Sequence, residues 1–207
     1  MSSASKKKVT AGADDGTRGN ILDAALRLLA DEGHAALTVR RVATEAGCST
    51  IGVYTWFGGK DGLVDAIWTQ GFGSFAAALR RVKPLDVPLG RLQAQALAYR
   101  RWALRHPRHY RVMFLNAVVD HVPSDTAIEV SLAAFTALQE AVREAYDRDE
   151  LNSDDLDAVA LAMWGIAHGL VSIELADVGP PRKDTRKLAD RAYKLGISSM
   201  VHGFTKR

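Results

Sequence analysis

The sequence predicts an all-α protein. Apolar residues recur at intervals of three and four in one segment after another, which is the period of one face of an α-helix. Residues that start or stop helices, chiefly Ser, Thr, Asp, Gly and Pro, separate these segments, and no stretch alternates convincingly as a β-strand would. With 207 residues, 47% of them hydrophobic, the chain is long enough for one or two domains with a sizeable core.

The N-terminal region is expected to hold a tail and a first helix. Residues 1–15 are rich in Ser, Lys, Ala and Gly, a composition typical of a disordered tail. An apolar stripe then predicts a helix that ends at Glu32-Gly33. Its members are Ile21, Leu22, Ala25, Leu26, Leu28 and Leu29.

Two short helices joined by a glycine-centred bend follow between residues 38 and 57. Thr38 precedes an apolar-periodic run, and its hydroxyl can accept a hydrogen bond from a free amide at the helix start. Gly47 ends that helix in a left-handed conformation at little cost, and Ser49 offers a second N-cap. The pattern indicates a helix-turn-helix, which places its second helix in a DNA major groove.

The second of these helices has a predicted inner and outer face. Val53 and Phe57 are four residues apart and should pack inward. Gly52 costs about 1 kcal/mol relative to alanine inside a helix, so its place implies either close helix packing or close approach to a ligand. The outward positions are Ile51 and Thr55, with Thr50 and Tyr54 near the edge.

Lys60 stands at the start of the next predicted helix, where a cation opposes the helix dipole. An external phosphate would resolve this, because it can bind both the lysine and the free amides of the helix end.

The remaining segments predict a linking helix and a helical second domain. Residues 61 to about 82 carry inward Leu63, Ile67, Phe72, Phe75 and Leu79, and Pro84 and Pro88 mark a boundary before a domain at 84–207. In that domain we expect a helix that stops near His106-Pro107 and another that starts at Pro107. The helix from about Ser124 to Tyr146 should bury Ile128, Leu132, Phe135, Leu138 and Val142. Ser153 should cap a helix that reaches about Val178 and stops at Gly179-Pro180-Pro181, and Asp184 should cap the last helix.

The N-terminal residues resemble a known family. Ala46-Gly47-Cys48-Ser49, followed by Tyr54, Phe57, Lys60 and Leu63, is similar to the signature of TetR-type transcriptional regulators, over about residues 15–75. The resemblance implies a three-helix DNA-binding domain in an all-helical dimer. It implies phosphate contacts from Thr38, Tyr54 and Lys60 and groove contacts from Thr50, Ile51, Gly52 and Thr55, and we add Arg40, Arg41 and Ser49 to the expected DNA-binding residues. Many members carry glycine at the position of Ile51, so this chain departs from the common pattern there.

A second resemblance lies in the C-terminal half. The run Trp164-Gly-Ile-Ala-His168-Gly169, with the segment His106 to Phe114, is similar to a regulatory domain of this family named for its Trp-His-Gly motif. This implies a small-molecule site walled by Trp102, Met113, Phe114, Phe135, Trp164 and His168, although each residue alone also suits a plain core. The resemblance also favours a two-fold dimer through the last two helices, with Tyr193, Ile197, Met200 and Phe204 at the interface.

Composition narrows the function classes. The charges, 27 Lys and Arg against 24 Asp and Glu, give a net charge of +3, and residues 1–65 are neutral overall. Residues 80–111 are strongly basic and residues 120–157 strongly acidic; these charges are solvated faces, a DNA-facing flank or an effector site. The sequence shows no apolar run of membrane-spanning length and no signal segment, which favours the cytoplasm.

Catalytic and metal-binding motifs are missing, so we expect neither an enzyme nor a cofactor or metal. His106 and His109 make a poor metal pair, because no acid or cysteine lies close in sequence. The single cysteine, Cys48, is better explained as a small packing residue than as a redox sensor.

Two functional classes remain open from the sequence. One is a dimeric DNA-binding regulator, most simply a repressor of a palindromic operator, that responds to a small apolar or amphipathic effector. The other is a helical ligand-binding or interaction protein in which the helix-turn-helix is only a packing unit.

Overall fold

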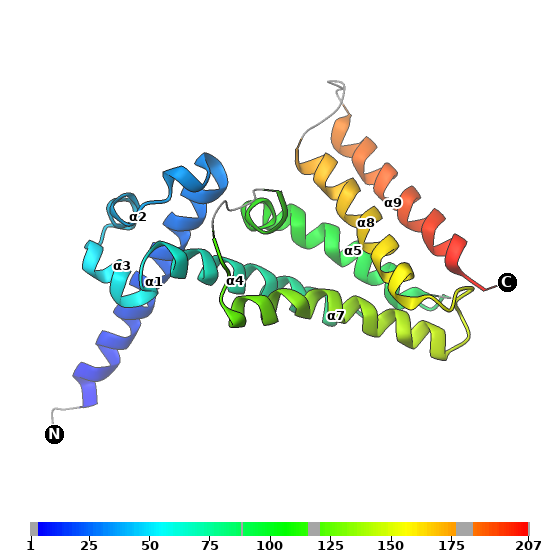
Figure 1. The fold of residues 1–207 in the computed structure, drawn as a ribbon, viewed down its shortest axis with the longest axis horizontal. Helices are drawn as coiled ribbons and strands as arrows, with labels where there is room; N and C mark the ends of the chain where they lie inside the picture. Colours follow the sequence, from blue (N-terminus) through cyan, green and yellow to red (C-terminus); the bar gives the residue numbers. More distant parts are fainter. Residues whose placement is uncertain (1–3, 88, 116–120, 177–183, 207) are drawn as a thin grey trace. The chain divides into compact units, whose positions relative to one another are not determined.

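A computed structural model describes residues 4–87, 89–115, 121–176 and 184–206, with side chains from Gly16 onward. Within these ranges the structure is helical, and the one extended pairing is an isolated bridge between Leu151 and Thr205 (Figure 1). The α-helices are α1 (Ala4–Glu32), α2 (Val39–Ala46), α3 (Thr50–Phe57), α4 (Lys60–Arg80), α5 (Gly90–Arg105), α6 (Pro107–Tyr110), α7 (Asp125–Asp147), α8 (Leu156–Leu175) and α9 (Thr185–Phe204). Two short turns complete them, the 3-10 turn η1 (His34–Ala36) and the π-helical turn η2 (Arg111–Leu115). The predicted all-α class is therefore confirmed.

The chain forms two compact units. The N-terminal unit comprises residues 1–71 and 108–129, and the C-terminal unit comprises residues 72–107 and 130–207. The division falls inside α4, whereas the sequence analysis placed a boundary at Pro84 and Pro88; of these, Pro88 lies outside the described residues. The segment after Pro107 belongs to the N-terminal unit, where Val112 is buried in the core and Arg108 pairs with Asp31 of α1 at 2.9 Å.

The core of the N-terminal unit is the predicted apolar stripe of α1 packed against α2, α3 and α4. Ile21, Leu28 and Leu29 are almost fully buried, and Val42, Val53 and Leu63 meet them from the following three helices. Cys48 lies partly buried against this core, as expected for a packing residue. α1 begins at Ala4, so the structure differs from the disordered tail predicted for 1–15; residues 4–15 contain no proline that would stop the helix.

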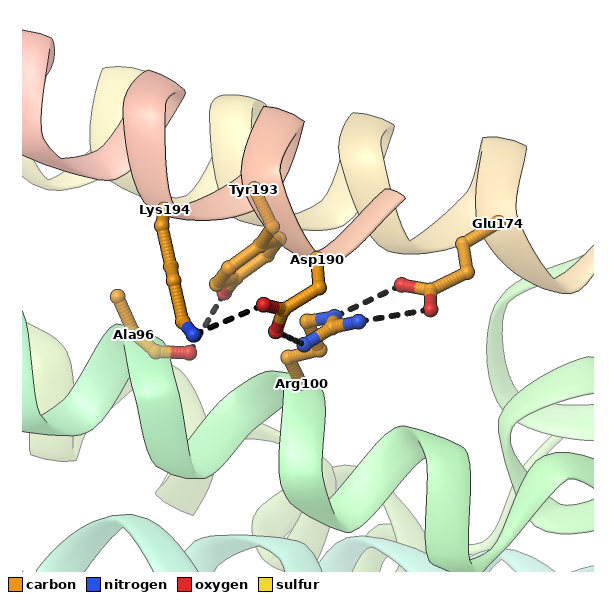
Figure 2. Close-up of polar contacts among 6 residues, drawn as sticks. All are labelled: Ala96, Arg100, Glu174, Asp190, Tyr193 and Lys194. Atoms are coloured by element: carbon orange, nitrogen blue, oxygen red, sulfur yellow. Dashed lines mark hydrogen bonds and ion pairs between the residues drawn. The ribbon is translucent and has the colours of Figure 1, made fainter. Parts of the chain in front are cut away.

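In the C-terminal unit, α8 packs side by side with α9, and both contact α5 (Figure 1). Figure 2 shows the polar contacts that join these three helices: Arg100 of α5 makes two hydrogen bonds of 2.8 Å to Glu174 of α8 and one of 2.8 Å to Asp190 of α9. Tyr193 is 1% exposed, and its hydroxyl donates to the carbonyl of Ala96 at 2.6 Å. The carboxylates raise the pKa of Arg100, and Lys194, followed by Arg100, lowers the pKa of Asp190.

Several charges of the basic segment 80–111 therefore have partners within the chain. Besides Arg100, Arg91 pairs with Glu144 at 2.5 Å, and Arg108 pairs with Asp31. The charges of these three arginines are therefore not simply exposed to solvent, because carboxylates of the same chain pair with them.

The predicted inner face of α7 is wrong at its first positions. Ile128 and Leu132 are 43% and 58% exposed, and alanines occupy most of the buried positions. Small residues are needed there because α5 lies close to α7. The side-chain amide of Gln95 on α5 donates to the backbone carbonyl of Ala137 at 3.0 Å. The buried residues of α7 are Ala127, Ala134, Ala137, Ala141, Val142 and Ala145.

The predicted helix ends need smaller corrections. α7 begins at Asp125, close to the predicted start, and the Ser124 hydroxyl caps it by accepting from the amide of Ala127 at 3.3 Å. α8 is capped by Asp155, which accepts from the amide of Ala158, because the Ser153 hydroxyl is bonded to the amide of Asp155 instead. Asp184 holds the N-cap position of α9 without a side-chain capping bond.

α8 also differs from two expectations of the sequence. It ends at Leu175 instead of about Val178, and the predicted stop at Gly179-Pro180-Pro181 lies outside the described residues. By length and composition α8 is apolar enough to cross a membrane, contrary to the sequence analysis, and 28% of its most apolar window is buried. One such helix is weak evidence for a span, because core and interface helices of soluble proteins have the same composition.

Candidate nucleic-acid interface

The turn between α2 and α3 has the predicted capping geometry. The Thr38 hydroxyl accepts from the amide of Arg41 at 3.3 Å, and the Ser49 hydroxyl accepts from the amide of Gly52 at 3.2 Å. Gly47 ends α2 with φ 66 and ψ 34, and the amide of Cys48 donates back to the Ala43 carbonyl at 3.0 Å. Left-handed glycine and paired caps fix the angle between the two helices.

α3 presents the outer face that its spacing predicts. Val53 is fully buried and Phe57 is 8% exposed, whereas Ile51 is 75% exposed and Tyr54 57% exposed. Thr50 and Thr55 are exposed too. The hydroxyl of Thr55 donates to the Ile51 carbonyl at 2.8 Å, so it remains free only to accept a further hydrogen bond.

Gly52 is not required by packing within the chain. A methyl group at this position would meet the Ser49 hydroxyl oxygen at 3.7 Å and the Cys48 sulfur at 4.0 Å, which are ordinary van der Waals distances. Of the two explanations that the sequence left open, close packing within the chain is not supported by these distances, and close approach of a ligand stays a prediction.

Lys60 and Tyr54 flank the turn that leads from α3 into α4. The Lys60 ammonium donates to the His34 carbonyl of η1 at 3.1 Å, which offsets part of the conflict with the helix dipole inside the chain itself. An ammonium has three donor hydrogens, so this bond leaves capacity for a phosphate. Tyr54 lies against Gly59, where an added methyl group would meet its ring at 3.4 Å.

Arg40 and Arg41 on α2 have different surroundings. Arg41 forms a two-pronged contact with Glu32, both hydrogen bonds being 2.9 Å long, and also pairs with Glu45 at 3.5 Å. The hydrogen bond to Glu32 raises the pKa of Arg41 and lowers that of Glu32. Arg41 therefore ties α2 to the end of α1, while Arg40 is exposed and pairs with no acidic group among the described side chains.

A second cluster, in the C-terminal unit, contains four of the six residues expected at an effector site. Trp102 lies 4.9 Å from the ring of Phe75 and donates to the Ser74 hydroxyl, and the ring of Phe135 lies 5.8 Å from that of Trp164. Trp102, Phe135, Trp164 and His168 thus come from α5, α7 and α8 of one unit. Met113 and Phe114 belong to the N-terminal unit, where Met113 packs over Gly71 of α4.

The ring of His168 lies 5.9 Å from that of Trp164 and also contacts Tyr99 of α5. Its Nδ1 lies 3.1 Å from the Tyr99 hydroxyl, and its Nε2 lies 3.4 Å from the Ser172 hydroxyl. Burial lowers the pKa of His168, so the ring is neutral near pH 7, with one nitrogen a donor and the other an acceptor. Tyr99 was not among the site residues predicted from the sequence, and its phenol hydroxyl is the signal that could have indicated a polar role.

A cavity in the C-terminal unit lies away from this cluster. It is an open depression of about 650 Å³ beyond the end of α7, lined largely by polar and acidic residues such as Asp147, Asp149 and Asp154. Its lining does not suit the apolar effector expected from the sequence.

Three of the four residues predicted at a dimer interface are buried within the chain. Tyr193 and Ile197 are each 1% exposed and Met200 is 7% exposed, so they pack inside their own subunit, and Phe204 is half-buried. The outward residues on the same pair of helices are Leu161, Gly165, Ile166 and Ile173 of α8 and Leu188 and Leu195 of α9. The predicted residues follow the correct helical period but on the inner face.

Two family descriptions match the sequence. Residues 21–67 match bacterial regulatory proteins of the tetR family, and residues 92–195, half of the chain, match the tetracyclin repressor-like C-terminal domain. An uncharacterized HTH-type transcriptional regulator of Mycobacterium tuberculosis is 26% identical over 162 residues, which cover 78% of this chain and 72% of that protein.

Solved structures share the fold across nearly the whole chain. A Rhodococcus sp. RHA1 protein of unknown function has a TM-score of 0.72 at 24% identity, covering 92% of this chain and 96% of the other. The TetR family regulator PfmR from Thermus thermophilus has a TM-score of 0.69 at 19% identity, covering 86% and 97%. The Trp-His-Gly subtype remains a prediction, although Trp164 and His168 lie inside the matched C-terminal range.

Proposed function

We propose that this chain, which belongs to the TetR family of DNA-binding transcription regulators, is a repressor that binds a palindromic operator as a homodimer and is released by a small effector. Membership in the family establishes DNA binding and regulation of transcription. The observation that carries the proposal is the outer face of α3, which is exposed and held in place by the capped turn at Gly47. It favours the regulator over a protein in which the helix-turn-helix is only a packing unit.

The expected contacts divide into two kinds. Thr38, Tyr54 and Lys60 contact phosphates, assisted by Arg40. The bases face Thr50, Ile51, Gly52 and Thr55. Ser49 and Arg41 act mainly by positioning, since Ser49 caps α3 and Arg41 is paired with Glu32.

Dimerisation uses the outward face of α8 and α9. Leu161, Ile173 and Leu195 are 57%, 56% and 69% exposed, which places large apolar side chains in water on neighbouring helices. A methyl group at Gly165 would meet nothing within 4 Å, so this glycine leaves space on the same face for a second copy. A two-fold pair also matches a palindromic operator. It accounts for the apolarity of α8 without a membrane, and we place the protein in the cytoplasm.

The effector site is the cluster around His168. The ring of Trp164 lies 5.9 Å from that of His168 and 5.8 Å from that of Phe135, and Trp102 lies on α5 of the same unit. Apolar rings beside an imidazole suit a small amphipathic ligand. α4 supplies Lys60–Gly71 to the N-terminal unit and continues into the C-terminal unit as one helix. A ligand that favours one geometry of α4 shifts the population of DNA-binding dimers.

A gel-shift assay tests this function with duplexes from the region upstream of the protein's own gene. We expect retention at about 50 mM salt that weakens strongly at about 200 mM, because phosphate contacts release counterions. No retention at low salt, or retention indifferent to salt, would contradict a DNA-binding regulator.

The same assay tests the dimer. Leu195→Arg should abolish specific retention and give a monomer in sedimentation, because a charge would be buried in the pairing face. Leu132→Arg on α7 is the matched control, since Leu132 is 58% exposed and lies outside that face. Equal behaviour of the two variants would contradict pairing through α8 and α9.

A further inference from the structure

We infer that the protein reads its operator chiefly through thymine methyl groups, with Ile51 as the contacting side chain. This inference rests on the proposed function, in which α3 enters the major groove. It specifies what kind of sequence that groove must contain.

The side chains of α3 restrict the possible base contacts. Direct readout of guanine uses Arg or Lys, readout of adenine uses Asn or Gln, and readout of cytosine uses Asp or Glu. The helix, Thr50-Ile-Gly-Val-Tyr-Thr-Trp-Phe57, contains none of these residues. Only hydroxyl groups and apolar surface remain for contact with base edges.

The hydroxyl groups of α3 are limited in turn. The proton of the Thr55 hydroxyl is already donated to the Ile51 carbonyl. Tyr54 lies against Gly59 at the entry to α4, beside the expected phosphate contacts. Thr50, at the first position of the helix, is the remaining hydroxyl on the outer face, and a single hydroxyl does not discriminate strongly between bases.

Ile51 has the most exposed large apolar side chain on this face. It is 75% exposed, the highest exposure among the large apolar residues of the N-terminal unit apart from Val122, which lies far from α3 in sequence. The thymine C5-methyl group is the apolar group that a base pair displays in the major groove. The two surfaces are complementary, and their contact removes both from water.

Gly52 makes this contact geometrically easy. Gly52 has no side chain, and the nearest side-chain atoms to a methyl group there would be the Ser49 hydroxyl oxygen at 3.7 Å and the Cys48 sulfur at 4.0 Å, so a base edge can come closer to the backbone beside Ile51 than at a residue with a side chain. The exposed Ile51 side chain, followed by a residue without a side chain, is therefore a shallow apolar surface that a methyl group can contact.

The test replaces thymine by deoxyuridine, which removes the C5-methyl and keeps base pairing. The probe is a duplex that the wild-type protein selects from a randomised pool at low salt. We expect uracil at one or more positions in each half-site to weaken binding about fourfold, the effect of losing one buried methyl group. Uracil outside the half-sites is the control and should have no effect.

Ile51→Ala links the effect to the side chain. It should bind thymine and uracil duplexes equally, and its exposure means that the fold is kept, which circular dichroism verifies. 5-methylcytosine at the sensitive position should bind better than cytosine, because it restores the methyl group on a different base pair.

Two results would overturn the inference while leaving the proposed function intact. One is retention that is insensitive to uracil at every position; the other is a uracil effect that persists unchanged in Ile51→Ala. A protein that retains no duplex from the pool fails both proposals, which separates the two kinds of failure.

Discussion

α3 and α7 differ in which apolar residues they bury. In α3 the large residues Val53 and Phe57 face the core, and the spacing of four predicts this correctly. In α7 the large residues Ile128 and Leu132 are exposed, while alanines such as Ala137 and Ala141 are buried. The contrast shows that large residues mark the inner face only where the neighbouring elements leave room for them.

The largest expected effect is at Gly62, where the start of α4 lies very close to the backbone at the end of α3. A methyl group at Gly62 would lie 1.7 Å from the Phe57 carbonyl oxygen, and a backbone atom cannot move aside as a flexible side chain does. Gly62→Ala should therefore cost at least about 3 kcal/mol of unfolding free energy, measured by urea denaturation.

Gly19→Ala is the matched control for Gly62→Ala. Gly19 lies in α1, and a methyl group there would meet nothing within 4 Å. The control should be neutral or stabilising by up to about 1 kcal/mol. Equal urea midpoints for the two variants would mean that the start of α4 does not pack on the end of α3.

The next effect concerns the alanine face of α7. Ala141 is 1% exposed, so Ala141→Leu should overpack the C-terminal unit and cost about 1–3 kcal/mol. Leu132→Ala, at a 58% exposed position, should change the unfolding free energy by no more than about 0.5 kcal/mol. Urea unfolding with unchanged m values measures both. The reverse ranking would show that the large residues form the inner face after all.

The two units therefore differ in how far their sequence predicts them. Around α3 the caps Thr38 and Ser49 and the left-handed Gly47 are local signals, and local hydrogen bonds satisfy them whatever the rest of the chain does. Helix periods were also predicted for the C-terminal unit, but the inner face of α7 and the outer face of α9 depend on how closely other helices approach. That distance is a tertiary property, to which Gln95 and Ala137 contribute together from separate helices.

The candidate sites follow the same division. The exposed positions of α3 were predicted because one turn fixes them. The ion pairs of Arg41 and the bond from Lys60 to the His34 carbonyl were not, because Glu32 ends α1 and His34 lies in the following connection, whose path the sequence pattern does not define. The contact between Tyr99 and His168 was not predicted either, because the two residues lie on different helices, 69 positions apart in sequence.

A small change in stability is expected at Gly52, and it separates stability from function. A methyl group at Gly52 would meet its neighbours only at ordinary van der Waals distances, so Gly52→Ala should stabilise the fold by up to about 1 kcal/mol, the helix-propensity difference between the two residues. The same methyl group would stand where a base edge approaches, so operator binding should weaken. Thermal unfolding and gel shifts on the same preparation measure the two effects.

Ala46→Gly, at the end of α2, controls for helix propensity, because Ala46 lies outside the outer face of α3 and the change should lower stability without altering base preference. Opposite signs for stability and DNA affinity in Gly52→Ala mean that the glycine is kept for the partner and not for the fold. If Gly52→Ala instead destabilised the protein, an unseen packing constraint would explain the glycine, and close approach of DNA would lose its support. A stable variant with unchanged affinity would place the bases farther from this part of α3.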